Sequence, residues 1–358
     1  MALGERVTDL PRGVAILGAG AIGSLIAVRL LRGRVPVTLV DSPEVARTIR
    51  EHGLVYERAH RPRLVLRDLD AISDWEELDR TEVANIGLVI STLKAGETAR
   101  AAASLEGHVP LEAPLLLLQE GVGGFEAARD HAGGRPLLAG ATTLGAGQPR
   151  AGVVRGVGRP GGVAVAPITA PEPVVRWVAG LLESGLRTRV CGDYRAMAWS
   201  RLVLGLPGNA VPAIVDRPPR QVLADAALFR LEVAALREAL AVMRALAVAP
   251  VGLPGFPVPA MAWAVDRLPL SILRRLLRHL TMSSADGERS SLRGELETGE
   301  RECGVEYLNG AVVRAGLALG VATPANALIY RTLTAMAQGT IPRDAYARNP
   351  HGLLAPTR

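Results

Sequence analysis

Lysine is almost absent from this chain of 358 residues: of 41 basic side chains only Lys94 is a lysine, and the others are arginines. Arginine, alanine, glycine and proline are all abundant, which indicates a codon bias. The net charge of +6 therefore favours no nucleic-acid partner, and it suits an anionic cofactor or substrate equally well. Aromatic residues make up only 3%, so a groove that stacks bases has little to work with.

Metal-binding patterns are missing as well. The two cysteines, Cys191 and Cys303, lie far apart, no CxxC or HExxH occurs, and the six histidines are scattered singly. We therefore expect no metal site. The apolar stretch 14–31 contains three glycines and Arg29, which makes it a poor membrane span. The N-terminus lacks a signal-peptide pattern, so we expect a cytoplasmic protein with no membrane partner.

Two domains are expected from the length and from a change of pattern along the chain. Residues 1–12 are predicted to be a flexible lead. Residues 13–168 alternate short apolar runs with helical spacing, which is typical of a parallel sheet covered by helices. Three prolines between 166 and 173 predict a linker. Residues 174–340 are predicted to be mostly α-helical and 341–358 an irregular tail, so the fold class is α/β with an N-terminal Rossmann domain and a helical C-terminal domain.

The loop after the first predicted strand is rich in glycine. It consists of Gly18, Ala19, Gly20, Ala21, Ile22 and Gly23, which is GxGxxG between a strand and a helix. Gly18 permits a tight turn, Gly20 lets a diphosphate approach the backbone, and Gly23 lets helix and strand pack closely. The free N–H groups at the helix start would bind the diphosphate. We therefore predict dinucleotide binding, with a purely structural glycine turn as the alternative.

An acidic residue ends the second predicted strand. Asp41 lies 18 residues after Gly23, where a carboxylate can accept hydrogen bonds from both ribose hydroxyls of NAD and would repel the extra phosphate of NADP. Arg47 and Arg50 lie close enough in sequence to reach that phosphate, so NAD is favoured only slightly over NADP. Ser42 is predicted to cap the following helix and to border the cofactor.

The single lysine follows the third predicted strand. An amine at the carboxyl end of a Rossmann strand, in a chain that otherwise uses arginine, suggests a role that a guanidinium cannot fill. Chance is the alternative, since one lysine must lie somewhere. Thr92, Leu93 and Lys94 are therefore candidate cofactor-binding residues, as are Gln119 and Glu120 after the fourth predicted strand. Lys94 and Gln119 would contact the inner half of the cofactor or the substrate.

Taken in order, these motifs resemble the ketopantoate reductase (2-dehydropantoate 2-reductase) family over nearly the whole chain. The matching segments after GxGxxG are 94–97 for KAxQ, 118–121 for LQNG, 140–143 for a threonine-rich segment, 199–209 for WxKLxxNxxxN, 290–310 for SSMLQDxxxGRxTEIDxxNG, and the ending 320–326. The resemblance implies an NAD(P)-dependent dehydrogenase or reductase of the 6-phosphogluconate-dehydrogenase-like fold, with the active site in the cleft between its domains. Dimers are common in the family, so a homodimer is one expectation.

The sequence departs from the family at several catalytic positions. The family's proton-donating lysine falls on Arg201, and an arginine stays protonated at any working pH and is a poor proton donor. The first asparagine of the same helix falls on Gly205, and the LQNG asparagine falls on Glu120. Codon bias explains one exchange of lysine for arginine, but it does not explain the lost asparagine. We therefore expect a substrate other than ketopantoate.

The last motif also differs. Its TEID carboxylate falls on Gly304, with Glu302 and Glu306 as displaced neighbours, whereas Asn209 and Ser291 carry over directly. Catalytic candidates are therefore Arg201, Glu120, Lys94, Asn209 and Ser291.

Arg201 is the expected ion-pair partner of Glu120, because both positions line one cleft in the family. The pair could orient a polar group of the substrate, and Glu120 could act as general acid or base. The alternative, held equally, is a surface acid in a loop and an unrelated charge on a helix face.

The predicted function is hydride transfer to or from a carbonyl, hydroxyl or imine carbon of a small molecule. The altered positions suggest specialised metabolism, such as natural-product biosynthesis. Two alternatives remain open on the same scaffold: a non-redox cyclase or isomerase, and a catalytically silent nucleotide-binding protein.

Overall fold

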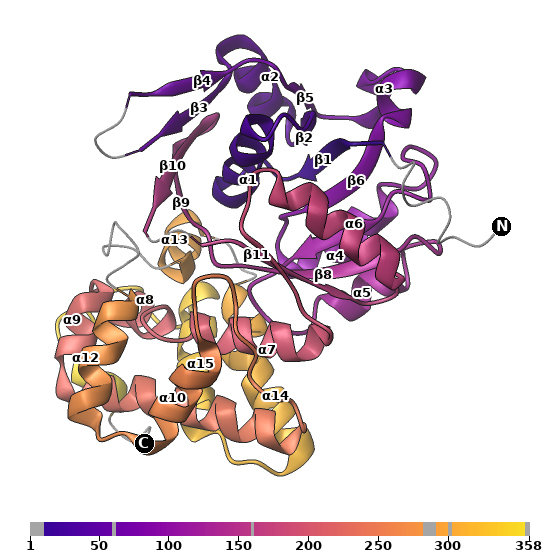
Figure 1. Cartoon of the computed structure of the whole chain (residues 1–358). Coiled ribbons are helices and arrows are strands. Elements are labelled where there is room, and N and C mark those ends of the chain that lie inside the picture. The colour runs from indigo at the N-terminus through magenta and orange to yellow at the C-terminus, as the bar shows by residue number, and fades with distance from the viewer. Residues whose placement is uncertain (1–10, 59–61, 159–160, 282–290, 300–302, 355–358) are drawn as a thin grey trace. The chain divides into compact units, whose positions relative to one another are not determined.

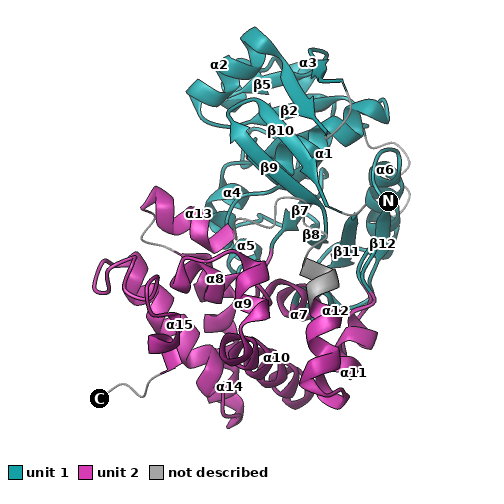
Figure 2. Cartoon of the chain, turned by 90° about the vertical axis from the view of Figure 1, so that its left-hand side faces the viewer, with its two compact units in different colours: residues 1–119, 123–198, 253–256 teal, residues 120–122, 199–252, 257–358 magenta. Residues whose placement is uncertain are grey.

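The computed structural model describes residues 11–58, 62–158, 161–281, 291–299 and 303–354 (Figure 1). The chain divides into two compact units (Figure 2). Unit 1 consists of residues 1–119, 123–198 and 253–256, and unit 2 of residues 120–122, 199–252 and 257–358.

An eight-stranded sheet forms the centre of unit 1, with the strand order β12-β11-β8-β7-β6-β1-β2-β5. The strands are β1 (Gly13–Leu17), β2 (Val37–Val40), β5 (Asp70–Ile72), β6 (Ile86–Ser91), β7 (Leu115–Leu118), β8 (Leu137–Thr142), β11 (Val163–Pro167) and β12 (Thr188–Val190). Only β8 and β11 pair antiparallel. The order runs outward in both directions from β1, which is the topological switch point where Rossmann folds bind dinucleotides. The predicted Rossmann sheet is confirmed.

Helices cover this sheet because its strands are apolar on both faces. They are α1 (Ala21–Arg32), α2 (Pro43–His52), α3 (Arg80–Ala84), α4 (Thr98–Ala103), α5 (Phe125–Arg129) and α6 (Glu172–Glu183), with the 3-10 turns η3 (Trp75–Glu77) and η4 (Ala95–Glu97). Leu88 and Ile90 of β6 belong to the same buried cluster as α1 and α6. Val89 lies between them, is equally buried, and faces the opposite side of the pleated sheet.

A second sheet, of four strands in the order β4-β3-β10-β9, lies beside α1 (Figure 1). Its strands are β3 (Leu54–Glu57), β4 (Leu64–Leu66), β9 (Gly145–Arg150) and β10 (Val153–Val157). The alternating pattern of residues 54–70 predicts a short β excursion, which contains β3 and β4; β5 begins at residue 70 and joins the first sheet. The sequence does not predict β9, because GAGQPR has neither apolar alternation nor β-branched residues.

Unit 2 is helical, as predicted. Its elements are α7 (Tyr194–Gly205, which begins in unit 1), α8 (Ala210–Val215), α9 (Pro219–Ala224), α10 (Ala226–Ala245), α11 (Val258–Arg267), α12 (Leu270–Thr281), α13 (Ser291–Thr298), η5 (Gly304–Tyr307), α14 (Asn309–Leu319), α15 (Pro324–Ala337) and η6 (Pro350–Leu354). The helix α10 packs against α9, α11, α14 and α15. Asp225 separates α9 from α10 because its carboxylate accepts the N–H groups of Ala227 and Leu228, capping α10.

The division between the units lies later than the linker predicted at 166–173. The prolines there mark the turn from β11 to α6, and Pro171 stands at the N-cap of α6. β12 pairs with β11, and α6 buries Val174 and Val178 in the core of the first sheet. Unit 1 therefore continues to residue 198, and the predicted boundaries of 168 and 174 are corrected.

The predicted ends of the chain are described only in part. Residues 1–10 of the predicted lead and 355–358 of the predicted tail lie outside the described residues. The described part of the tail includes η6, where His351 Nε2 lies 2.8 Å from Asp225 Oδ2. Among the described residues no helix has both the length and the apolar character needed to cross a bilayer.

Candidate functional site

The glycine loop between β1 and α1 is drawn tightly onto the neighbouring strands. Gly18 N–H donates to the Val40 carbonyl at 2.9 Å, and the Thr92 hydroxyl donates to the Gly18 carbonyl at 2.9 Å. A Cβ at Gly23 would collide with the Gly18 carbonyl oxygen, so only glycine lets α1 start this close to the loop. Thr92, at the end of β6, is therefore part of the loop's support.

The outer side of the same loop is open. Gly20 is exposed, and a Cβ placed there would meet no atom within 4 Å. The first turn of α1 carries no acidic residue and no side-chain cap, and Ala21 and Ile22 are partly exposed. Backbone N–H groups at an uncapped helix start attract anions. The loop therefore fits the diphosphate of a dinucleotide.

Asp41 is turned towards the glycine loop. Its Oδ2 accepts the Ala19 N–H at 2.6 Å, and its Oδ1 accepts the Ser42 N–H at 2.7 Å. Each carboxylate oxygen can accept a further hydrogen bond, so Asp41 keeps the capacity to bind ribose hydroxyls. Ser42 occupies the N-cap of α2 but makes no capping hydrogen bond with its side chain, so the predicted cap by the Ser42 hydroxyl is wrong.

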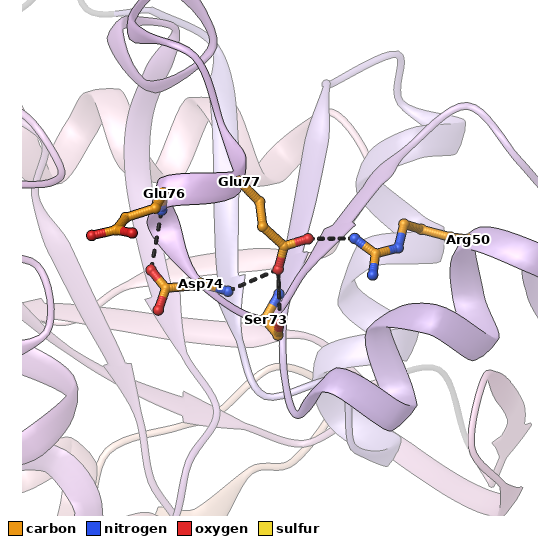
Figure 3. A network of polar contacts seen from close by, with 5 residues as sticks. All are labelled: Arg50, Ser73, Asp74, Glu76 and Glu77. Atoms are coloured by element: carbon orange, nitrogen blue, oxygen red, sulfur yellow. Dashed lines mark hydrogen bonds and ion pairs between the residues drawn. The ribbon is translucent and has the colours of Figure 1, made fainter.

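The two arginines considered for a cofactor phosphate differ in their surroundings. Arg50 forms an ion pair with Glu77 of η3 (Figure 3). The same carboxylate accepts the hydroxyl and N–H of Ser73, at 2.6 and 2.7 Å, and the N–H of Asp74. These hydrogen bonds lower the pKa of Glu77 to about 2, and the bond from the Ser73 hydroxyl has the largest effect. Glu77 therefore stays ionised at neutral pH. Arg50 is thus held at η3, while Arg47 is exposed on α2.

The ends of β6 and β7 carry the remaining cofactor candidates of unit 1. Leu93 is partly exposed, and Lys94 is exposed at the start of η4. Gln119 is 5% exposed, and neither polar atom of its amide has a hydrogen-bond partner among the described residues. A Cβ at Gly124 would lie 2.5 Å from Gln119 Oε1. A buried unpaired amide costs free energy that a bound cofactor's polar groups can offset.

In unit 2, Arg201 and Glu120 form an ion pair. Arg201 Nη2 donates to Glu120 Oε1 at 2.6 Å; the arginine side chain is 13% exposed and the glutamate 49%. A Cβ at Gly205, one helical turn after Arg201, would lie only 2.8 Å from Arg201 Nη1. The guanidinium therefore lies over Gly205. A side chain at 205 would require the flexible end of the Arg201 side chain to shift.

Asn209 and Ser291 also come together. The Ser291 hydroxyl donates to Asn209 Oδ1 at 3.2 Å, and Leu292 N–H donates to the same oxygen at 3.4 Å. Asn209 is the N-cap residue of α8, and Ser291 begins α13, which packs against α8.

One acidic residue beside these two is absent from the sequence-based candidates. Glu295 lies one turn after Ser291 on α13 and accepts the Gly304 N–H at 2.7 Å through Oε2. A Cβ at Gly304 would lie 3.1 Å from Glu295 Oε1, so this carboxylate fills the space that the glycine leaves. The spacing of four between Ser291 and Glu295 on a helix is the signal that could have identified it.

Of the two acidic residues on either side of Gly304, Glu302 and Glu306, the described one does not supply the carboxylate that the family has at position 304. Glu306 binds Arg314 and the Tyr330 hydroxyl, and this hydrogen bond raises the pKa of Tyr330. Glu302 lies outside the described residues.

The contacts in unit 2 join the loop that carries Glu120, α7, α8, α13 and η5 into one ring of neighbouring segments. The loop that carries Glu120 is joined to η5, because Val122 N–H donates to the Tyr307 carbonyl at 2.9 Å. The hydrogen bonds above join η5 to α13 and α13 to α8, and α8 follows α7, which is paired with the loop. We call the residues of this ring the unit 2 cluster: Glu120, Arg201, Asn209, Ser291 and Glu295. In the described part of the chain, no group of three or more histidine, cysteine or acidic residues could hold a metal ion.

Comparison with known families gives two matches. A model described as ketopantoate reductase PanE/ApbA matches residues 14–169, and the model of the C-terminal part of that family matches residues 193–337. Among curated proteins, the 2-dehydropantoate 2-reductase of Pyrobaculum aerophilum is 24% identical over 323 residues, which is 89% of this chain and 96% of that enzyme. The enzyme of Halobacterium salinarum is 29% identical over 206 residues, 57% of this chain and 65% of its own length.

Solved structures show that the fold is shared. The PanE/ApbA family ketopantoate reductase from Ralstonia eutropha JMP134 has a TM-score of 0.74 at 23% identity, over 91% of this chain and 99% of that chain. The ternary structure of D-mandelate dehydrogenase with NADH and anilino(oxo)acetate also has a TM-score of 0.74, at 20% identity and with the same coverage.

Proposed function

Because the chain belongs to the ketopantoate reductase PanE/ApbA family, and is thus an NAD(P)-dependent oxidoreductase, we propose that it uses NAD(H) to reduce or oxidise a small molecule other than ketopantoate. The reacting centre is a carbonyl, hydroxyl or imine carbon. The observation that carries the preference for NAD(H) is the Asp41 carboxylate, which lies against the glycine loop at the end of β2.

The residues of unit 1 would hold the cofactor. The open face at Gly20 and the uncapped start of α1 suit the diphosphate, and Asp41 suits the adenosine ribose. The buried amide of Gln119 suits a polar group at the inner end of the cofactor. When bound, the nicotinamide supplies or accepts the hydride. A 2′-phosphate would meet the charge of Asp41, and Arg50 is already paired with Glu77.

The unit 2 cluster would bind the substrate. Arg201 can donate hydrogen bonds to a substrate oxygen and stabilise negative charge that develops on it. It does not release a proton readily, so Glu120 or a substrate group must move the proton. Asn209 and Ser291 offer neutral hydrogen-bonding groups, and Glu295 offers a carboxylate for a hydroxyl or amine of the substrate.

The same cluster supports a substrate other than ketopantoate. Gly205 and Gly304 contribute no side chain, Arg201 covers the first, and Glu295 fills the space beside the second. A site whose hydrogen-bonding groups lie at other positions than in the family discriminates strongly against a substrate that leaves those groups unpaired. The names of the solved relatives, a ketopantoate reductase and a D-mandelate dehydrogenase with NADH, support a small 2-oxo or 2-hydroxy compound as the substrate class.

The test follows the absorbance of the reduced nicotinamide. Purified protein is mixed with NADH or NADPH and a panel of 2-oxo acids including ketopantoate, simple ketones and cyclic imines. We expect NADH oxidation with at least one compound, at a higher kcat/KM than with ketopantoate. A product found by mass spectrometry without net NADH oxidation would instead support the cyclase or isomerase.

Substitution of Glu120 tests its proton transfer. Glu120→Gln should lower kcat by about 10² or more, because a general acid or base contributes about 10²–10⁴ to the rate. Glu126→Gln, an exposed acid on α5, is the matched control. Activity of Glu120→Gln within about threefold of the unmodified protein would remove Glu120 from the proton chemistry.

A further inference from the structure

A residue of the second sheet reaches the glycine loop. Gln148 lies on β9, which packs beside α1 (Figure 1), and its Nε2 donates to the Ala19 carbonyl at 2.7 Å across 129 residues of sequence. The Ser24 hydroxyl, on α1 itself, donates to the same carbonyl at 2.8 Å. Two donors from different parts of unit 1 therefore hold one carbonyl.

The other polar atom of Ala19 is held as well. Its N–H donates to Asp41, so neither its N–H nor its carbonyl is left to solvent, and Ala19 is only 1% exposed. Asp41 and Gln148 thus lie at the two ends of one residue, directly before Gly20.

Holding this carbonyl also orients the next amide. The carbonyl of Ala19 and the N–H of Gly20 belong to one planar trans peptide, so they point in opposite directions. The Gly20 N–H donates to no described residue, and the space at Gly20 is open. Gln148 therefore holds in place an amide donor that remains available for a ligand.

From these contacts we propose that Gln148 is a positioning residue for the cofactor: it preorganises the Gly20 amide that binds the diphosphate of the nicotinamide dinucleotide. The proposal rests on the proposed function. An amide suits this place, because it donates to the carbonyl without adding a charge, whereas a carboxylate could not donate and would repel the diphosphate. The second sheet then supports cofactor binding and does more than cover α1.

The test compares nucleotide fragments in binding experiments with the whole protein. Gln148→Leu keeps the size of the side chain and removes the donor, and Gln148→Lys keeps a donor of similar length. We expect Gln148→Leu to weaken NADH binding about 5- to 10-fold by calorimetry, the range for one hydrogen bond, and to weaken ADP binding similarly. Adenosine, which has no phosphate, should bind both proteins equally, and Gln148→Lys should bind NADH within about threefold of the unmodified protein.

Gln221→Leu, an exposed glutamine on α9, is the matched control and should leave NADH binding unchanged. Unchanged NADH binding by Gln148→Leu overturns the proposal. So does an equal loss for NADH and adenosine, because a general disturbance of unit 1 would affect both. If the unmodified protein binds neither NADH nor NADPH, the proposed function fails, and this inference fails with it.

Discussion

Asp41 links the proposed choice of cofactor to one carboxylate. It accepts hydrogen bonds from Ala19 and Ser42, so its position is defined by the loop it faces. Of the two arginines considered for a 2′-phosphate, Arg50 is paired with Glu77 (Figure 3), whereas Arg47 is exposed on α2. In the proposed function, the negative charge of Asp41 would oppose the 2′-phosphate of NADP.

Removing that charge should change the preference. Asp41→Asn keeps one acceptor for the Ala19 N–H and no longer repels a phosphate, so the ratio of NADPH to NADH affinity should rise about tenfold or more, the effect of about 1.4 kcal/mol. Dissociation constants from calorimetry with both cofactors provide the measurement. Glu44→Gln, on the adjacent helix α2, should leave the ratio unchanged. An unaltered ratio in Asp41→Asn would show that Asp41 does not discriminate between the cofactors.

Arg201 shows why exchanging lysine for arginine alters a site. The guanidinium needs more room than an ammonium group, and its Nη2 donates to Glu120 Oε1. That room comes from Gly205, where even a Cβ would lie 2.8 Å from Arg201 Nη1. The family resemblance indicates the two exchanges separately, and the structure shows that the Arg201 guanidinium lies over Gly205.

The junction between α7 and α8 depends on a buried acid of α10. Glu232 is 2% exposed, and its Oε1 and Oε2 lie 3.3 and 3.2 Å from the Gly208 N–H. Gly208 precedes Asn209, the N-cap residue of α8 that binds Ser291. Burial raises the pKa of Glu232 to about 8 from an ordinary value of 4.5, so the carboxyl is neutral in the folded protein near pH 7.

This raised pKa should make stability depend on pH. The folded state holds a proton that the unfolded state releases between pH 4.5 and 8, so the free energy of unfolding should fall as pH rises through that window. The free energy of unfolding should change by several kcal/mol, because each pKa unit corresponds to about 1.4 kcal/mol. Glu232→Gln keeps an acceptor for Gly208 and cannot ionise, so urea unfolding should show a smaller loss of stability between pH 5 and 8 than in the unmodified protein.

Glu126→Gln, an exposed acid on α5, serves as the reference for the ordinary pH dependence of the chain. Equal slopes for Glu232→Gln and the unmodified protein would mean that Glu232 does not carry the buried proton.

At the scale of the whole chain, the first unit continues to residue 198 and does not end at the prolines near 170. The helix α6 and the strand β12 complete the first sheet, and α6 buries Val174, Val178 and Leu182. Burying each such side chain contributes about 1.5–3 kcal/mol. The loss of several such side chains would remove a large part of the 5–15 kcal/mol free energy of unfolding of a typical domain.

Two fragments test this boundary. A fragment of residues 1–198 should unfold cooperatively and bind NADH, because it keeps α6, β12 and the glycine loop. A fragment of residues 1–173 should lack a cooperative transition in circular dichroism, because the sheet face under α6 is uncovered. Cooperative folding of the shorter fragment would contradict the assignment of α6 to unit 1.

The sequence alone determined the features that are local in the chain. The strand, the glycine loop, the helix and Asp41 lie within 30 residues, and their pattern of glycine, apolar and acidic residues specifies backbone conformation directly. The helical character of unit 2 followed from periodicity in the same way, and the pairing of Glu120 with Arg201 was one of two alternatives that the sequence left equal. The sequence pattern predicted none of β9, β10 and β12: β9 is exposed at its end, β12 has three residues, and in β10 only Val153 and Val154 are buried.

Only the tertiary structure decided which distant side chains meet. Gln148 reaches Ala19, Glu295 fills the space beside Gly304, and α6 belongs to the first unit. Such contacts depend on how helices and strands pack, and on space that a missing Cβ leaves open. These are properties of three-dimensional arrangement, which no spacing along the sequence encodes.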